Sequence, residues 1–309
     1  MQFREVASGL RFPEGPVALD DGSVLVVEIE GGTLARVAPD GRVERVATLG
    51  GGPNGIAIGP DGAAYVCNNG GLHFIHSPDG TMRPAHQPDD YSGGRVERVD
   101  LTTGRVERLF DTVDGVRLKG PNDIVFDAGG GFYFTDLGKV RAQEVDRGGV
   151  YYAGPGYASA APVAAPAMTP NGVALSPDDK TLYYAETEGA RVWAFDVTGP
   201  GQVRRDPWPS PHGGRLVVAA PGGHYQRFDS MAVDALGNLY VATLLHGGIT
   251  IVSPDGSICR HLPLPDRYPT NVCFGGPDLR TLYVTLSGGG KLIAFDDWPV
   301  PGHRLHFSR

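Results

Sequence analysis

The amino-acid sequence predicts an all-β fold, a single six-bladed β-propeller with four-stranded antiparallel blades that occupies residues 1–309. Three observations lead to this prediction. A Pro-Asp-Gly turn phrase returns along the chain, similar short apolar segments flank its copies, and no segment shows a sustained apolar period of about 3.6 residues. Many short strands at a repeated spacing are typical of propellers, so we expect few helices.

The turn phrase is expected to join antiparallel strands. Proline fixes φ at the first turn position, aspartate bonds its own backbone, and glycine accepts a positive φ. Such a turn brings the chain back alongside the strand that it has just left. Clear copies lie at 38–41, 59–62, 77–80 and 253–256, and degenerate copies lie at 176–179 and 276–279.

The strands around these turns fall into six units. Strands of small apolar residues, such as 55–58 and 172–175, stand before turns, and strands with Tyr and Val, such as 64–66 and 182–184, stand after them. Small residues suit the innermost strands because these strands crowd around the propeller axis. The six inner strands are expected to begin near Glu14, Asn54, Asn122, Asn171, Asp229 and Asn271.

Closure of the propeller requires a strand from the N-terminus. Residues 3–10 are expected to supply the last strand of the C-terminal blade, which would leave no open seam. The Pro/Gly/Ala-rich stretch 154–170 is predicted to be a loop between blades. A pair of β-sandwiches is the alternative fold, but it would not explain a repeat that runs from end to end.

Composition limits the partners. The net charge of −8 leaves no basic footprint, so we expect no nucleic-acid partner. The chain has no run of about 18 apolar residues and no apolar leader, so we expect no membrane partner and a cytoplasmic location. The expected partner is a small-molecule substrate, and the oligomeric state stays open. The cysteines Cys67, Cys259 and Cys273 match no zinc spacing and are expected to be buried thiols.

One polar residue stands at the start of each inner strand, and equivalent positions on successive blades should form a ring around the axis. The ring contains one Glu, one Asp and four Asn, at Glu14, Asn54, Asn122, Asn171, Asp229 and Asn271. Their hard oxygen atoms suit calcium or magnesium better than zinc or copper, and two carboxylates match one dication. The sequence therefore predicts one divalent cation in the channel, with Ca²⁺ favoured and Mn²⁺, Mg²⁺ and Zn²⁺ as alternatives. Asn54 and Asn271 are also explained as turn or substrate-facing residues.

The phrases at 13–16, 121–123, 170–172 and 229–231 resemble the regucalcin–gluconolactonase (senescence marker protein) family of six-bladed propeller lactonases. The resemblance covers residues 12–295 and implies Glu14, Asn171 and Asp229 as metal ligands. It implies Asn122 as a fourth ligand or as a substrate hydrogen-bond donor beside the metal. The diisopropyl fluorophosphatases, a more distant group, carry a similar Glu/Asn/Asn/Asp quartet.

The chain departs from that family at one position. The family commonly places an Arg two residues before the counterpart of Asn122, where this sequence has Gly120 preceded by Lys119. Two interpretations follow: Lys119 takes the place of this arginine, or the substrate differs from that of the family. The expected substrate-binding residues are Asn122, Asn54, Lys119, Asp123 and His224.

These residues predict a hydrolase that opens an aldonolactone-like ring. The metal would polarise the lactone carbonyl, and the resemblance implies Asp229 as the general base that activates water. The cation and an asparagine amide would stabilise the oxyanion. The alternatives are a phosphotriester hydrolase on the same metal site, a non-enzymatic calcium-binding propeller, and a relative that has moved to a condensation or dehydration.

Overall fold

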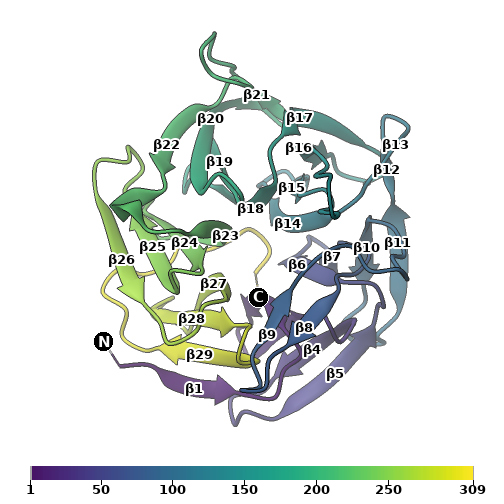
Figure 1. The fold of residues 1–309 in the computed structure, drawn as a ribbon, viewed down its shortest axis with the longest axis vertical. Helices are drawn as coiled ribbons and strands as arrows, with labels where there is room; N and C mark the ends of the chain where they lie inside the picture. Colours follow the sequence, from purple (N-terminus) through teal and green to yellow (C-terminus); the bar gives the residue numbers. More distant parts are fainter. Residues whose placement is uncertain (1, 309) are drawn as a thin grey trace.

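Six antiparallel sheets stand around a common axis in the computed structural model, which describes residues 2–308 (Figure 1). The first blade contains β2 (Pro13–Ala18), β3 (Val24–Glu28), β4 (Thr33–Val37) and β5 (Val43–Thr48). The second contains β6 (Pro53–Ile58), β7 (Ala64–Asn68), β10 (Arg95–Val99) and β11 (Val106–Phe110). The third contains β14 (Pro121–Phe126), β15 (Phe132–Asp136), β16 (Gly148–Ala153) and β17 (Ala160–Ala167).

The second half of the chain builds three further blades. The fourth contains β18 (Pro170–Leu175), β19 (Thr181–Glu186), β20 (Arg191–Gly199) and β22 (Arg215–Ala219), and the short β21 (Gln202–Val203) also pairs with β20. The fifth contains β23 (Arg227–Val233), β24 (Leu239–Leu244), β25 (Gly248–Val252) and β26 (Cys259–Pro263). The sixth contains β27 (Pro269–Gly275), β28 (Thr281–Leu286), β29 (Lys291–Phe295) and β1 (Arg4–Ala7). The predicted six-bladed architecture is thus confirmed.

Three small elements lie outside the blades. The hairpin of β8 (Phe74–His76) and β9 (Met82–Pro84) extends from the second blade across the first blade to the sixth, where the Met82 N–H donates to the Gly288 carbonyl at 2.8 Å (Figure 1). A second hairpin pairs β12 (Thr112–Val113) with β13 (Val116–Arg117). Within residues 2–308 the helical content is a single 3₁₀ turn, Pro221–Gly223, in agreement with the expected scarcity of helices. No helix in this range is long and apolar enough to cross a membrane.

The N-terminal strand closes the ring, as the sequence predicts. Strand β1 pairs antiparallel with β29, with Arg4 opposite Ala294 and Glu5 opposite Ile293. The ion pairs Arg4–Asp296, at 2.7 Å, and Lys291–Glu5, at 2.8 Å, flank this seam. Main-chain hydrogen bonds thereby hold the N-terminal segment, which leads into the first blade, in the last blade, and β29 is not left as an edge strand.

The hydrophobic core lies between neighbouring blades. Inner strands such as β6, β14 and β18 are buried along their whole length, because a blade covers each of their faces. Between the second and third blades, the Tyr65 ring packs against Phe126 and Phe132 with centroid distances of 5.1 and 5.9 Å. Aromatic contacts of this kind hold adjacent blades in a fixed relative position.

Two local expectations are wrong. The stretch 154–170 is not only a loop, because residues 160–167 form β17, the outer strand of the third blade. Proline is tolerated in a strand at the edge of a sheet, where its missing N–H leaves no partner unpaired. Cys67 and Cys273 are buried, as expected, but Cys259 lies exposed on the outer strand β26.

Candidate metal centre and substrate cavity

The same irregularity interrupts the pairing of every inner strand near its first residues. The register shifts between Glu14 and Val17 in the first blade and between Pro170 and Val173 in the fourth. The other four inner strands shift at the corresponding place. A bulge bends a strand and redirects a side chain. The repeated shift in register therefore changes the direction of the polar side chain near the start of each inner strand, compared with its direction in a regularly paired strand.

Glycine after the polar residue lets neighbouring inner strands approach closely. A Cβ on Gly15, whose φ is +55°, would lie 2.6 Å from the Asn54 carbonyl oxygen of the next blade. A Cβ on Gly172 would lie 2.7 Å from the Ser230 Cα. The Asn-Gly and Glu-Gly pairs that look like turn chemistry in the sequence thus serve close packing around the axis.

Five of the six predicted ring residues line one cavity of about 390 Å³ at the starts of the inner strands. They are Glu14, Asn54, Asn122, Asn171 and Asp229, and each is at most 9% exposed. The cavity walls also include apolar side chains, among them Phe12, Leu72, Tyr225 and Tyr268. The structure therefore brings together residues from five blades at one end of the channel.

Asn271, the sixth ring residue, supports Glu14 instead of facing this cavity. Its Nδ2 donates to Glu14 Oε2 at 2.9 Å, and its Oδ1 accepts from the Val272 backbone N–H at 2.7 Å. Asn271 lines a second cavity towards the opposite end of the channel. This position fits the prediction that Asn271 has a role other than metal binding.

Two buried oxygens of the cavity residues lack a hydrogen-bond partner among residues 2–308. They are Glu14 Oε1 and Asn122 Oδ1. Asn171 Nδ2 donates to Thr187 Oγ1 at 2.9 Å, so the amide group of Asn171 is oriented by a neighbouring hydroxyl. Buried acceptors are almost always paired in proteins. Unpaired acceptor oxygens from several blades are what a hard cation requires.

The carboxyl groups of this cavity are in an electrostatically unfavourable position. Burial raises the pKa of Glu14 well above its ordinary value, and the nearby charges of Asp229 and Asp123 raise it further. Burial also raises the pKa of Asp229 to about 7, although a hydrogen bond from Asn171 opposes this shift. A dication between two such carboxylates would stabilise both ionised forms.

The donor set fits an oxygen-liganded divalent cation. Within residues 2–308 no three His, Cys, Asp or Glu side chains form a metal cluster, so a cation here would also need amide oxygens. Glu14 and Asp229 supply the carboxylates, and Asn171 and Asn122 supply the amides. A set with no thiolate and no imidazole matches calcium or magnesium.

Three of the predicted substrate-binding residues are not among the residues that line this cavity. Asp123 accepts from the Val173 and Ile124 backbone N–H groups, at 3.1 and 3.0 Å, and lines the opposite end of the channel. Its carboxylate therefore joins two inner strands. Lys119 Nζ donates to Asp146 Oδ1 at 2.6 Å, which draws its side chain away from the cavity.

His224 also lies elsewhere. Its ring stacks on His246 with a centroid distance of 4.2 Å, and His246 stacks on His261 at 4.1 Å. These histidines line a separate hollow beside the fifth blade. The neighbours Tyr225 and Arg227 do reach the channel cavity. Side chains near the start of β23 thus line two different cavities, and the sequence does not show which residue lines which.

The backbone explains why Gly120 replaces an arginine. A Cβ at this position would lie 2.3 Å from the carbonyl oxygen of Gly138. Asp136 holds the two segments together, because its carboxylate accepts from the Gly120 and Gly138 backbone N–H groups at 2.7 and 2.8 Å. Any side chain at position 120 would separate these segments, so the backbone here accommodates only glycine.

Sequence reasoning missed Lys139 and Arg83, which line the cavity together with His86. Arg83 lies in β9, and His86 follows this strand, so the β8–β9 hairpin contributes to the cavity wall. Lys139 comes from the loop after β15, on the same side of the propeller as the start of β14. A lysine directly after the second strand of a blade was the available signal, but it has no counterpart in the other blades.

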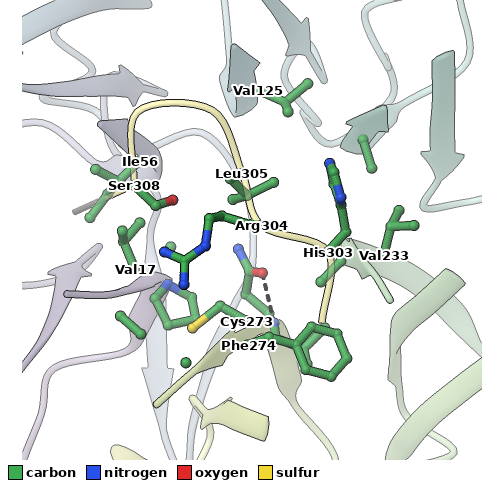
Figure 2. A pocket seen from close by; sticks show the side chains of 18 of the residues that line it. Val17, Ile56, Val125, Val233, Cys273, Phe274, His303, Arg304, Leu305 and Ser308 are labelled. Atoms are coloured by element: carbon green, nitrogen blue, oxygen red, sulfur yellow. Dashed lines mark hydrogen bonds between the residues drawn. The ribbon is translucent and has the colours of Figure 1, made fainter. Parts of the chain in front are cut away.

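The C-terminal segment covers the opposite end of the channel (Figure 2). His303, Arg304 and Leu305 line the second cavity, of about 90 Å³, together with Val17 and Cys273. The His303 backbone N–H donates to the Val233 carbonyl at 3.0 Å. The larger cavity, at the strand starts, is the one that Glu14 and Asp229 line.

Comparison with known proteins places this chain in a family. The family model described as SMP-30/Gluconolactonase/LRE-like region matches residues 12–288. Lactonase drp35 of Staphylococcus saprophyticus is 30% identical over 249 residues, which are 80% of this chain and 68% of that protein. The 6-deoxy-6-sulfogluconolactonase of Pseudomonas putida is 31% identical over 248 residues, which are 75% of this chain and 81% of that protein.

Solved structures share the fold. A gluconolactonase from Xanthomonas campestris superposes with a TM-score of 0.73 at 22% identity, over 97% of this chain and 89% of that one. A calcium-binding protein, regucalcin from Agrobacterium tumefaciens, superposes with a TM-score of 0.71 at 18% identity, over 96% and 95%. The match of the family model to most of the chain, together with this fold, shows that the chain belongs to the SMP-30/gluconolactonase/LRE-like family.

Proposed function

We propose that this protein is a divalent-cation-dependent lactonase that opens a small aldonolactone-like ring, with calcium as the preferred cation. Two relatives that are about 30% identical are named as lactonases, and a structural neighbour is described as a calcium-binding regucalcin. The observation that carries the proposal is the pair of buried, unpartnered oxygens, Glu14 Oε1 and Asn122 Oδ1, in one cavity with Asp229.

Each residue has a distinct task in this proposal. Glu14, Asn171 and Asp229 would hold the cation, with Asn122 as a fourth ligand or as a donor to the substrate. A bound divalent cation would polarise the lactone carbonyl as a Lewis acid. Asn54, at most 6% exposed and at the same cavity, would hydrogen-bond the substrate.

Asp229 is the proposed general base. It would take a proton from a water molecule while the water oxygen bonds to the carbonyl carbon of the lactone. The resulting oxyanion would accept a hydrogen bond from an asparagine amide of the cavity wall. Breakage of the ring C–O bond would then release a hydroxy acid, and the abstracted proton would pass to the ring oxygen.

Lactone opening tests the proposal directly, because it releases acid that a pH indicator reports. We expect purified protein to open glucono-δ-lactone with Ca²⁺, Mn²⁺ or Zn²⁺ and to lose this activity after chelation. Asp229→Asn should lower the rate by at least about 100-fold, as removal of a general base does. Asp127→Asn is the matched control, because Asp127 is buried but bonds Tyr152 outside the cavity.

Three outcomes would count against the proposal. Several lactones left unopened with all three cations would remove the lactonase assignment. Fluoride release from an organophosphate, without lactone opening, would support the phosphotriester hydrolase alternative. Binding of calcium with no turnover of either substrate class would support a non-enzymatic calcium-binding propeller.

A further inference from the structure

Lys139 is a buried lysine in the wall of the substrate cavity. It is 2% exposed, and it lines the cavity that also contains Glu14, Asn122 and Asp229. Lysine is almost never fully buried unless it is paired with an acid. The question is therefore which group balances the positive charge of Lys139 in this cavity wall.

The side-chain contacts of Lys139 are all with neutral groups, and only its backbone N–H meets a carboxylate, Asp146 Oδ2, at 3.3 Å. Its Nζ donates to the Gly71 carbonyl at 2.7 Å and to Asn69 Oδ1 at 3.3 Å, and the Tyr91 ring centroid lies 5.1 Å away. No carboxylate among residues 2–308 accepts a hydrogen bond from this ammonium group. Burial accordingly lowers the pKa of Lys139 to about 7.

The two nearest acids are committed to other groups. Asp136 accepts from the backbone N–H groups of Lys119, Gly120 and Gly138. Asp146 accepts from Lys119 Nζ at 2.6 Å and from two nitrogens of Arg141 at 2.8 Å each. Asp146 Oδ2 also accepts from the Lys139 backbone N–H at 3.3 Å, but both carboxylates act on the ammonium group of Lys139 only through their charges. The ammonium group thus has no direct counterion.

A buried charge without a counterion is costly, and an anion placed beside it removes much of that cost. Arg83, an exposed residue of β9, lines the same cavity and adds a second positive charge to its wall. The acids that line the cavity are Glu14 and Asp229 at the proposed cation and Glu188, which pairs with Arg227 at 3.1 Å. The cavity therefore has one end suited to a cation and a wall suited to an anion.

We infer that the substrate is a lactone that carries a second, anionic group, a carboxylate, sulfonate or phosphate, and that Lys139 binds this group. The inference rests on the proposed lactonase function and specifies its substrate class. Lys139 is a specificity residue here, because it would contact the substrate away from the reacting carbonyl. A neutral sugar lactone would leave the ammonium group of Lys139 without its counterion.

Matched pairs of lactones test this inference. Glucaro-1,4-lactone differs from glucono-1,4-lactone by a carboxylate, and 6-phosphoglucono-δ-lactone differs from glucono-δ-lactone by a phosphate. The 6-deoxy-6-sulfo analogue of glucono-δ-lactone tests a sulfonate in the same way. We expect kcat/KM to be higher for an anionic member than for its neutral partner. Lys139→Met should lower kcat/KM for the anionic member by about 10- to 100-fold, the size of a hydrogen bond to a charged group, and change the neutral one little.

Asn69→Asp is a second variant that keeps the lysine and the side-chain shape. The new carboxylate would stand where Asn69 Oδ1 now accepts from Lys139, and it would keep the bond from the Gly71 N–H at 2.9 Å. It should abolish the preference for anionic lactones as Lys139→Met does, and Lys139→Arg should restore part of it. Lys119→Met is the control, because Lys119 pairs with Asp146 outside the cavity.

The outcomes separate the two proposals. An equal ratio of anionic to neutral kcat/KM in the wild type, Lys139→Met and Asn69→Asp would overturn the inference while leaving the lactonase function in place. Lys139 also borders a third cavity, which Lys119, Arg108 and Arg117 line. Loss of selectivity in Lys119→Met, with none in Lys139→Met, would place the anion in that third cavity and would likewise overturn the inference. No opening of any lactone would overturn the proposed function itself.

Discussion

Asn271 Nδ2 donates a hydrogen bond of 2.9 Å to Glu14 Oε2, although 257 residues separate the two along the chain. The bond joins β27, the inner strand of the last blade, to β2, the inner strand of the first. It occupies one oxygen of the Glu14 carboxylate and leaves the other, Oε1, without a partner among residues 2–308. The orientation of a proposed metal ligand thus depends on closure of the propeller.

Removal of this bond should weaken cation binding. We expect Asn271→Ala to raise the dissociation constant for Ca²⁺ by about 10- to 100-fold, as loss of a group that orients a metal ligand does. Isothermal titration calorimetry measures this change. Asn238→Ala is the matched control, because Asn238 Nδ2 makes a similar bond to Asp234 Oδ2 away from the cavity. Equal affinities in Asn271→Ala and the wild type would refute the supporting role.

Closure itself is testable by truncation. Deletion of residues 2–8 would remove β1 and leave the backbone groups of β29 unpaired. We expect thermal unfolding to shift to a clearly lower temperature and Ca²⁺ binding to weaken with it. Arg4→Ala is the control, because it removes only an exposed ion pair with Asp296, which contributes at most about 1 kcal/mol. If the truncated chain were as stable as Arg4→Ala, the pairing of β1 with β29 would not be what stabilises the closed propeller.

Restoring the family's arginine should harm this protein. In Gly120→Arg the new Cβ would meet the Gly138 carbonyl, so the two segments would have to separate. We expect a loss of about 1–3 kcal/mol in the free energy of unfolding, as overpacking causes, and no gain of lactonase activity. Denaturant unfolding and the acid-release assay measure both quantities. A stable and more active Gly120→Arg would show that the arginine site is still present.

His212 should make stability depend on pH below neutrality. Burial, helped by the charges of nearby arginines, lowers the pKa of His212 to about 4, and its Nε2 lies 2.7 Å from the Tyr184 hydroxyl. An unfolded histidine titrates near pH 6.5, so the unfolded chain binds more protons between pH 6.5 and 4. The free energy of unfolding should therefore fall as the pH falls through this window.

His212→Gln separates this effect from other titrations. The variant removes the ionisable ring, so its free energy of unfolding should change less between pH 6.5 and 4 than that of the wild type. Urea unfolding at several pH values measures the two slopes. Parallel slopes for His212→Gln and the wild type would mean that His212 does not control the acid sensitivity.

Residues that follow the six-fold blade repeat could be placed from the sequence, whereas residues outside the repeat could not. Glu14, Asn171 and Asp229 share one phase of a six-fold repeat, so the axis had to bring them together. Lys139 lies in the segment between β15 and β16, outside the repeated strands, and only the folded loop shows that it is buried beside Gly71. Lys119, two residues before the start of β14, gave no sign of its bond to Asp146.

Anomalous diffraction from crystals soaked in CaCl₂ or MnCl₂ tests the central claim, that residues far apart in the sequence bind one cation. We expect a single strong peak in the channel cavity, about 2.3–2.6 Å from oxygens of Glu14, Asn171 and Asp229 for calcium. The peak should disappear in crystals of the Glu14→Gln, Asp229→Asn double variant. A cavity without a peak at saturating cation, or a peak that survives in the double variant, would contradict the claim.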